Sequence, residues 1–339
     1  VIEDGILNGS LSGGESIGTT GRGIGPCYRD KVGRSLAIRL GDLYRSDFRS
    51  TFDHIIEVKR RFLEASQPAG SNVIELDSDK IFDQYQGYAE RLRDYVGETT
   101  NYLLDSVENG RRVLFEGAQG ALLDIDHGTF PFVTSSNSSG VGVSSGSGVP
   151  GRWITRSIGV LKAYSTRVGG GPVPTEQDNN VGKHLQQRGN EFGTVTQRPR
   201  RCGWFDAVAT RYSARLSGVD ELAVMLLDVL AELDEVKICT GYRINGTVVD
   251  QFPSQIDDLK IAEPIYETLP GWQEDLTRAR KEADLPANAI RYIDRIGELL
   301  SRPVTIVSVG PDREQTIFRT DHTKPAPCPP NTQQEAATV

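Results

Sequence analysis

Residues 193–204, GTVTQRPRRCGW, concentrate positive charge in a chain that is acidic overall. They place Arg198, Arg200 and Arg201 among threonine and glycine residues, with Arg188 just upstream, whereas the 339-residue chain has a net charge of −8. Guanidinium groups bind carboxylates and phosphates through paired, charge-assisted hydrogen bonds, and threonine hydroxyls or glycine N–H groups can complete such a pocket. The segment therefore predicts a focused site for a small anion. The alternative is a solvated basic loop.

Composition and charge exclude several classes of protein. The acidic balance argues against a broad nucleic-acid or membrane-surface role, which would need a basic face. The four cysteines, at positions 27, 202, 239 and 328, show no CxxC or Cys/His spacing, so we expect neither a disulfide framework nor a zinc site. Without an apolar run of about 18 residues or a signal-peptide pattern, we expect a cytoplasmic protein.

The elements that must hold the site begin with helical patterns. The opening to about residue 33 is rich in glycine and serine, which predicts a loop. Apolar residues then recur at helical spacing over 46–65 and again over 78–108, and Asn109-Gly110 predicts the end of the second helix. A further helical face runs from Phe205 to Leu216, and another includes Ile290 and Leu300.

Short apolar runs between these helices predict strands that end in loops rich in glycine or aspartate. The predicted strands are 113–115, which leads into the loop 116–120, then 158–168, 222–227, which ends at Asp228, 304–308, and a hairpin around Asn245-Gly246. Residues 128–151 predict an ordered, ligand-facing loop. We therefore expect an α/β fold with a largely parallel central sheet, flanking helices and small antiparallel subregions.

The sequence gives little support for the glycine motifs that bind dinucleotides or nucleoside triphosphates. GSGVPG at 146–151 fits GxGxxG, but a Ser/Gly-rich loop precedes it and Pro150 lies inside it, so a Rossmann dehydrogenase is disfavoured. The chain also contains no GxxxxGK[ST] sequence.

Taken together, several blocks of sequence resemble the adenylosuccinate synthetase family from about residue 17 to 320. The matching blocks are IGTTGRGIGP (17–26), FEGAQGALLDIDHGTFPFVTSSN (115–137), LKAYSTRVGGGPVPTE (161–176), GNEFGTVTQRPRRCGW (189–204), EPIYETLPGW (263–272) and SVGPDR (308–313). The resemblance implies a C–N ligase of AMP biosynthesis that joins L-aspartate to IMP through 6-phosphoryl-IMP, with GTP as co-substrate and Mg²⁺ as cofactor. It also implies a P-loop-NTPase-like fold and a homodimer, and the acidic balance argues against a nucleic-acid or membrane partner.

The same resemblance implies a domain plan. We expect one α/β domain over residues 1–320, with its N-terminal part absent and a helical insertion at about 44–110. Residues 321–339 are rich in proline and polar residues, which predicts a disordered tail.

The resemblance also carries site residues over to this chain. Those implied for IMP are Thr20, Arg34, Gln119, Thr134, Val168 and Arg198, with Arg34 reaching the partner subunit's site. Those implied for aspartate are Thr194, Val195, Thr196, Gln197, Arg198 and Arg200. Those implied for GTP are Arg200, Leu226, Leu227, Asp228, Ser308, Val309 and Gly310.

The chain departs from the family pattern at several of these positions. Leu226 stands where the family has lysine, while Asp228 keeps the carboxylate that accepts both guanine N–H donors, so we expect GTP to be preferred over ATP. Val195, Gln197 and Pro199 stand where the family has threonine, glycine and, in many members, arginine.

The family's GDEGKGK segment, with its aspartate base and Mg²⁺ ligand, and the catalytic histidine that follows do not occur in these 339 residues. We assign no catalytic role to His54, His127, His184 or His322, and we expect Asp124 and Asp126 to form a hydrogen-bonded turn. We therefore expect this polypeptide alone to be inactive. The alternatives are a non-catalytic nucleotide- or RNA-binding module and a different ligase or kinase of purine nucleotides.

Overall fold

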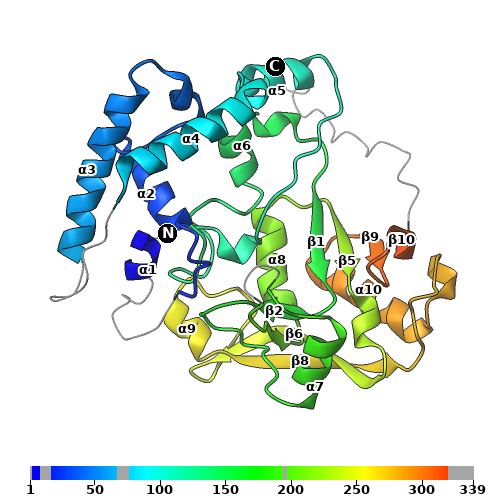
Figure 1. Cartoon of the computed structure of the whole chain (residues 1–339). Coiled ribbons are helices and arrows are strands. Elements are labelled where there is room, and N and C mark those ends of the chain that lie inside the picture. Colours follow the sequence, from blue (N-terminus) through cyan, green and yellow to red (C-terminus); the bar gives the residue numbers. More distant parts are fainter. Residues whose placement is uncertain (1, 8–16, 67–75, 194–196, 320–339) are drawn as a thin grey trace, which may run out of the picture. The chain divides into compact units, whose positions relative to one another are not determined.

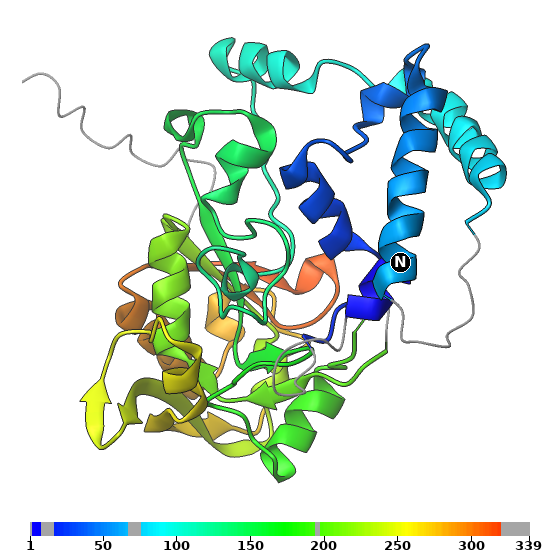
Figure 2. The same cartoon turned by 90° about the vertical axis from the view of Figure 1, so that its left-hand side faces the viewer.

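The computed structural model describes residues 2–7, 17–66, 76–193 and 197–319 of the chain (Figures 1 and 2). The chain divides into two compact units. The first comprises residues 1–114 and 134–136, and the second comprises residues 115–133 and 137–339.

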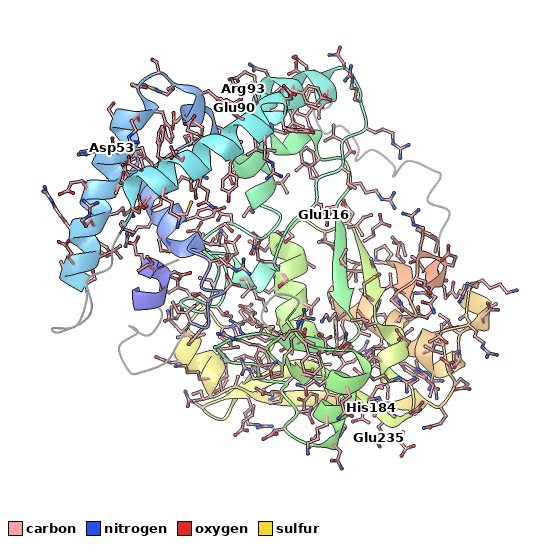
Figure 3. All side chains as sticks on the ribbon, in the orientation of Figure 1. Asp53, Glu90, Arg93, Glu116, His184 and Glu235 are labelled. Carbon is pink, nitrogen blue, oxygen red and sulfur yellow. The ribbon has the colours of Figure 1, made fainter. Side chains whose placement is uncertain are left out.

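The first unit is helical (blue to cyan in Figures 1 and 2). Its described helices are α1 (Ile2–Leu7), α2 (Ile24–Gly33), α3 (Phe48–Ser66), α4 (Ser78–Leu92) and α5 (Thr99–Glu108). The Phe82 ring of α4 lies 5.7 Å from Phe48 and 5.6 Å from Phe52 of α3, measured between centroids. The charged residues Asp53 and Glu90 lie on α3 and α4, and Arg93 directly follows α4 (Figure 3). Apolar residues of α3 and α4, together with Leu43, thus form a small core in this unit.

Two predictions for the first unit are wrong in detail. Residues 1–33 contain α1 and α2 as well as loop, and Pro26 is accommodated in the first turn of α2, where its missing N–H loses no helical bond. The predicted helix over 78–108 is two helices, because Val96 is extended and Gly97 follows it. Gly110 has a φ of 71° and ends α5 as expected.

The second unit contains the sheets (green to orange in Figure 1). Its main sheet has the order β1 (Ile158–Lys162), β5 (Glu221–Met225), β9 (Val304–Ser308) and β10 (Thr316–Phe318). The β1–β5 and β5–β9 pairs are parallel, and β10 is antiparallel to β9. A second sheet joins β4 (Phe205–Asp206), β6 (Leu233–Ile244), β7 (Thr247–Val249) and β8 (Glu263–Trp272), and a small one pairs β2 (Ser165–Arg167) with β3 (Arg201–Gly203).

The remaining described helices of this unit are α6 (Gly142–Ser147), α7 (Asn180–Arg188), α8 (Ala207–Leu216), α9 (Ile256–Lys260) and α10 (Ala287–Leu300). The core lies where α8 and α10 meet the sheets, with Val224, Ile293 and Val307 fully buried in one cluster. After Glu221, β5 is apolar from Leu222 to Met225 because both faces are covered, as is typical of a parallel sheet. The predicted α/β class, with a parallel central sheet and antiparallel subregions, is confirmed.

Several strand predictions need correction. Residues 113–115 form no strand, and Leu114 is 90% exposed, because no described strand lies beside this run to pair its backbone. The strand predicted over 158–168 is β1 and β2, which belong to different sheets. The predicted strand over 222–227 ends at Met225, because Leu226 adopts a left-handed conformation with a φ of 62°.

The remaining local observations concern a hairpin, a loop and a strand. The hairpin is confirmed: β6 pairs antiparallel with β7, and both Asn245 and Gly246 have positive φ, as a two-residue type I′ turn requires. The predicted loop over 128–151 includes the short helix α6. β8 was not predicted, because Pro264 and Pro270 are unusual within a strand; they are tolerated because β8 pairs on one side only, with β6.

The predicted single domain over 1–320, with its insertion at 44–110, stays a prediction. The predicted tail, 321–339, lies outside the described residues. None of the helices that the structure describes has both the length and the apolar composition that a membrane span requires.

Candidate functional site

The carboxyl ends of β5 and β9 lie side by side in the second unit. Val224 is paired with Val307, so the segment Leu226 to Asp228 and the segment Ser308 to Gly310 continue from neighbouring parallel strands at the same edge. Ligands of open α/β sheets bind at this edge. The structure thus brings together the residues predicted to bind the guanine base, although they lie about 80 positions apart in the sequence.

The side chain of Asp228 presents a buried hydrogen-bond acceptor at this edge. Its Oδ1 is shielded from solvent and has no hydrogen-bond partner among the described residues. Burial raises the pKa of Asp228. Arg188 approaches the backbone instead, donating from Nε to the Asp228 carbonyl at 3.2 Å, and pairs with Glu232 at 2.7 Å. An unpaired buried acceptor is costly, so this carboxyl group is suited to a ligand that brings hydrogen-bond donors.

The turn after β9 is fixed by internal hydrogen bonds. The Ser308 hydroxyl donates to the Gly310 carbonyl at 2.8 Å, and the Val309 N–H donates to the Gln315 carbonyl at 3.0 Å. A Cβ atom at Gly310 would lie 2.2 Å from the Gln315 side-chain oxygen, so a larger residue there would displace the Gln315 side chain. The Gln315 amide in turn donates to the Thr277 carbonyl at 3.0 Å. This wall of the site is therefore rigid.

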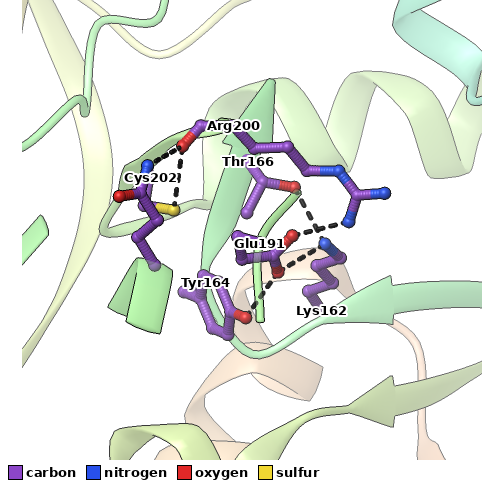
Figure 4. A network of polar contacts seen from close by, with 7 residues as sticks. Lys162, Tyr164, Thr166, Glu191, Arg200 and Cys202 are labelled. Carbon is purple, nitrogen blue, oxygen red and sulfur yellow. Dashed lines mark hydrogen bonds and ion pairs between the residues drawn. The ribbon is translucent and has the colours of Figure 1, made fainter. Parts of the chain in front are cut away.

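A second group of polar residues surrounds Glu191, as Figure 4 shows. The Glu191 side chain is almost completely buried, with 1% exposed. Its Oε1 accepts from Lys162 Nζ at 2.6 Å and from the Tyr164 hydroxyl at 2.5 Å, and its Oε2 accepts from Arg200 Nη1 at 2.6 Å. One carboxylate thus organises the end of β1 and the arginine-rich segment.

The network shifts the ionisation of its members. Burial works to raise the pKa of Glu191, but the hydrogen bonds from Lys162, Tyr164 and Arg200 outweigh it and lower that pKa. Burial lowers the pKa of Lys162, and burial together with the neighbouring Glu191 raises the pKa of Tyr164. Sequence reasoning missed Glu191 and Lys162. The available signal was one acid, in GNEFG, directly before a cluster of arginines.

The arginines of residues 193–204 differ in their surroundings. Arg201 is engaged within the fold: it pairs with Glu176 at 3.0 Å and donates to the carbonyls of Gly169 and Gly171 at 3.1 and 2.6 Å. Arg198 is exposed, and Arg200 is half-buried beside Glu191. The predicted anion site therefore has two candidate arginines rather than three.

Two main-chain hydrogen bonds close the loop between Glu191 and these arginines. The Gly193 N–H donates to the Arg198 carbonyl at 2.8 Å, and the Gln197 N–H donates to the Gly193 carbonyl at 2.7 Å. Gln197 has a φ of 51°, a conformation that favours glycine. The predicted aspartate-binding residues Thr194, Val195 and Thr196 lie outside the described residues.

The other residues predicted to bind IMP fall in both units. In the first unit, Thr20 and Arg34 are exposed and Thr134 is half-buried. In the second unit, Gln119 is exposed and has a φ of 61°, and Val168 is 38% exposed beside the glycine run 169–171. Nothing in the geometry of either unit tests their predicted roles.

The Asp124–Asp126 segment is a hydrogen-bonded turn, as expected. Asp124 is fully buried and accepts hydrogen bonds from the N–H groups of Asp126 and His127 at 3.0 and 3.2 Å. It also accepts from the N–H and the hydroxyl of Ser139, at 3.0 and 2.8 Å. His184, labelled in Figure 3, places Nε2 3.0 Å from the Val229 carbonyl oxygen. These groups are engaged in the fold.

Comparison with known proteins matches the resemblance inferred from the sequence blocks. The family model described as adenylosuccinate synthetase matches residues 3–317. The chain is 49% identical over 306 residues to the adenylosuccinate synthetase of Heliobacterium modesticaldum, covering 90% of this chain and 70% of that protein. It is 45% identical over 317 residues to that of Caldanaerobacter subterraneus subsp. tengcongensis, covering 93% of this chain and 73% of that protein.

A solved structure agrees with these sequence matches. The fully ligated adenylosuccinate synthetase from Plasmodium falciparum superposes with a TM-score of 0.88 at 36% identity, covering 94% of this chain and 74% of that one. The motifs, the family model and the fold agree, and the chain belongs to the adenylosuccinate synthetase family.

Proposed function

We propose that this chain provides substrate-binding machinery for the GTP-dependent ligation of L-aspartate to IMP, which yields adenylosuccinate, GDP and phosphate through 6-phosphoryl-IMP. Membership of the family supports the reaction class. The observation that carries the choice of nucleotide is Asp228, whose Oδ1 is buried without a hydrogen-bond partner among the described residues.

Asp228 would select guanine by its hydrogen-bonding pattern. Guanine presents two neighbouring donors, N1–H and the 2-amino group, and a carboxylate can accept from both. Adenine has an acceptor at N1 and no amino group at C2, so it would leave the buried oxygen unpaired. Leu227, Ser308, Val309 and Gly310 would line the same pocket. Leu226 would supply apolar contact to the base without charge, and GTP would remain preferred over ATP.

The arginine-rich segment would handle the anionic substrates. In the proposed reaction the GTP γ-phosphate is transferred to O6 of IMP, and the amine of aspartate then displaces it, so negative charge has to be stabilised throughout. Arg198, with Thr194 to Gln197, would bind aspartate through its carboxylates. Arg200 would extend toward the phosphates of GTP from its anchor on Glu191.

IMP would contact Thr20, Gln119, Thr134, Val168 and Arg198. Arg34 would reach the IMP of a partner subunit, in a cytoplasmic homodimer. Sedimentation analysis tests the dimer, because a monomer at every accessible protein concentration would exclude a role for Arg34 across an interface.

Mg²⁺ belongs to the proposed reaction. The described residues contain no group of three or more His, Cys, Asp or Glu side chains that could hold a metal ion by themselves, but Mg²⁺ is usually held by one or two carboxylates together with water and substrate phosphates. No step proposed above depends on the metal. Since the 339 residues also lack the GDEGKGK segment, we propose that this polypeptide binds substrates but does not turn them over by itself.

Calorimetric titration of the polypeptide with IMP, GTP and L-aspartate tests the proposal. We expect each substrate to bind, and we expect AMP to bind more weakly than IMP. A polypeptide that is folded by circular dichroism and binds none of the three would contradict the assignment. Mixing all substrates with Mg²⁺ then tests turnover: adenylosuccinate formation would support the ligase and overturn the proposed inactivity.

A further inference from the structure

The Glu191 carboxylate is paired with two cations, although one cation would neutralise its charge. A buried carboxylate is neutralised by one cation, yet Glu191 binds both Lys162 and Arg200, each at 2.6 Å. The three groups together have a charge of +1. The neighbouring acid Glu176 does not compensate for it, because Glu176 pairs with Arg201 at 3.0 Å. The excess positive charge lies on cations that are partly removed from water, so a ligand of negative charge would stabilise the cluster.

Both cations keep donors available for that ligand. The Lys162 ammonium has three N–H donors, of which one goes to Glu191 and one to the Thr166 hydroxyl at 3.0 Å. Arg200 uses Nη1 for Glu191, and its Nε and Nη2 have no side-chain partner among the described residues. The Lys162 and Arg200 side chains are 29% and 28% exposed. A ligand can therefore reach both cations, while Glu191 cannot be reached.

The location agrees with a ligand-binding role. Lys162 is the last residue of β1, and β1 runs parallel to β5, whose carboxyl end leads to Asp228. Lys162 pairs in register with Met225, three positions before Asp228. The cation cluster and the unpaired Asp228 oxygen thus belong to neighbouring strand ends of one sheet. A nucleotide bound at Asp228 would therefore lie at the same edge of the sheet as the cation cluster.

We propose that Lys162 is a ligand-binding residue and that Glu191 is a positioning residue which holds Lys162 and Arg200 as a paired site for an oxyanion. The oxyanion is a phosphate of the bound nucleotide or a carboxylate of the amino-acid substrate. The identity of the ligand rests on the function proposed above, whereas the existence of an anion site does not.

The test compares Lys162→Met with Lys183→Met, a matched loss of one lysine charge from the exposed face of α7. Binding of GTP, guanosine and L-aspartate is measured by calorimetry. Because charge-assisted hydrogen bonds are the strong ones, we expect Lys162→Met to weaken GTP binding about tenfold or more, with guanosine binding unchanged. Lys183→Met should change the affinities for GTP and guanosine by no more than about twofold. Lys162→Arg should restore much of the GTP affinity.

Each outcome either supports or overturns the proposed anion site. A selective loss of GTP binding identifies the phosphate as the anion, and a selective loss of L-aspartate binding identifies the carboxylate; either supports the site. Unchanged binding of both, or an equal loss of GTP and guanosine binding, would overturn it. Thermal unfolding of Lys162→Met and Lys162→Arg shows whether each is folded.

If the wild-type polypeptide binds neither GTP nor guanosine, its assignment as a GTP-binding protein fails, and inorganic triphosphate becomes the probe. Triphosphate binding that Lys162→Met weakens would still support the anion site. Absence of both triphosphate and L-aspartate binding to the wild-type polypeptide would overturn it.

Discussion

Glu191 binds Arg200 at two points: its main-chain carbonyl accepts the Arg200 N–H at 2.9 Å, and its Oε2 accepts Nη1 at 2.6 Å. The backbone and the guanidinium of Arg200 are therefore held by the same residue. These two hydrogen bonds hold Arg200 in place. Arg198, in the same loop, is exposed.

Replacing Glu191 should destabilise the fold strongly. Glu191→Ala leaves Lys162, Arg200 and the buried Tyr164 hydroxyl without their acceptor, and breaking one side of a buried ion pair costs about 3–5 kcal/mol. The free energy of unfolding in urea measures the loss. Glu267→Ala is a suitable control, because Glu267 pairs with Arg295 at a half-exposed position and should cost about 1 kcal/mol or less. Equal losses for the two variants would contradict the central place of Glu191.

Acid should destabilise the second unit. Burial works to raise the pKa of Asp124, but hydrogen bonds from Ser139, Asp126 and His127 outweigh it and lower that pKa below its ordinary value. A folded-state pKa below the unfolded-state pKa stabilises the fold above the unfolded value, about 4 for an aspartate, and this stabilisation is lost as the pH falls toward the folded value.

Urea unfolding at pH 7, 4 and 3 measures this dependence. Asp124→Asn should lower stability at pH 7 by about 2–4 kcal/mol, because its amide would face hydrogen-bond donors, and it should flatten the dependence on pH. Ser213→Ala, which removes a hydroxyl that donates to the Ala209 carbonyl rather than to a carboxylate, should keep the wild-type dependence. An Asp124→Asn variant as acid-sensitive as the wild type would contradict the assignment.

Gln197 has a left-handed backbone conformation, with a φ of 51°. Gln197→Gly should therefore raise the free energy of unfolding, by up to about 1 kcal/mol after the greater freedom of the unfolded glycine is taken into account. Gln197→Val should lower it, because a β-branched residue tolerates this conformation poorly. Thermal unfolding measures both changes, and the opposite order of stability would exclude strain at this position.

Features encoded by neighbouring residues could be predicted from the sequence. Asn245-Gly246 specifies its own turn, and the apolar run of β5 reveals a strand covered on both faces. Aspartate at the end of that strand indicated a ligand site, and Asp228 indeed lies at the carboxyl edge of the sheet. Long-range features could not be predicted in this way: residues 113–115 have strand composition but no described pairing neighbour.

The network around Glu191 depends on the tertiary fold. Glu191 is 29 positions from Lys162 and 27 from Tyr164, so no local pattern joins them. The arginine cluster was visible in the sequence, but its residues were not equivalent: Arg201 is engaged by Glu176 and two backbone carbonyls. The composition showed the charge, and only the fold distinguishes Arg200, which is half-buried beside Glu191, from Arg201, which binds Glu176 and two backbone carbonyls.

The most direct test of the proposed function is the nucleotide preference conferred by Asp228. Calorimetric titration of GTP and ATP against the wild-type polypeptide should show tighter binding of GTP. Asp228→Asn should weaken GTP binding about tenfold or more, because one charged acceptor is lost and a donor faces the guanine N–H groups. Asp234→Asn, at an exposed position of β6, should leave the preference intact. Equal affinities for GTP and ATP in the wild type, or a preference unchanged in Asp228→Asn, would contradict the guanine site and the function proposed from it.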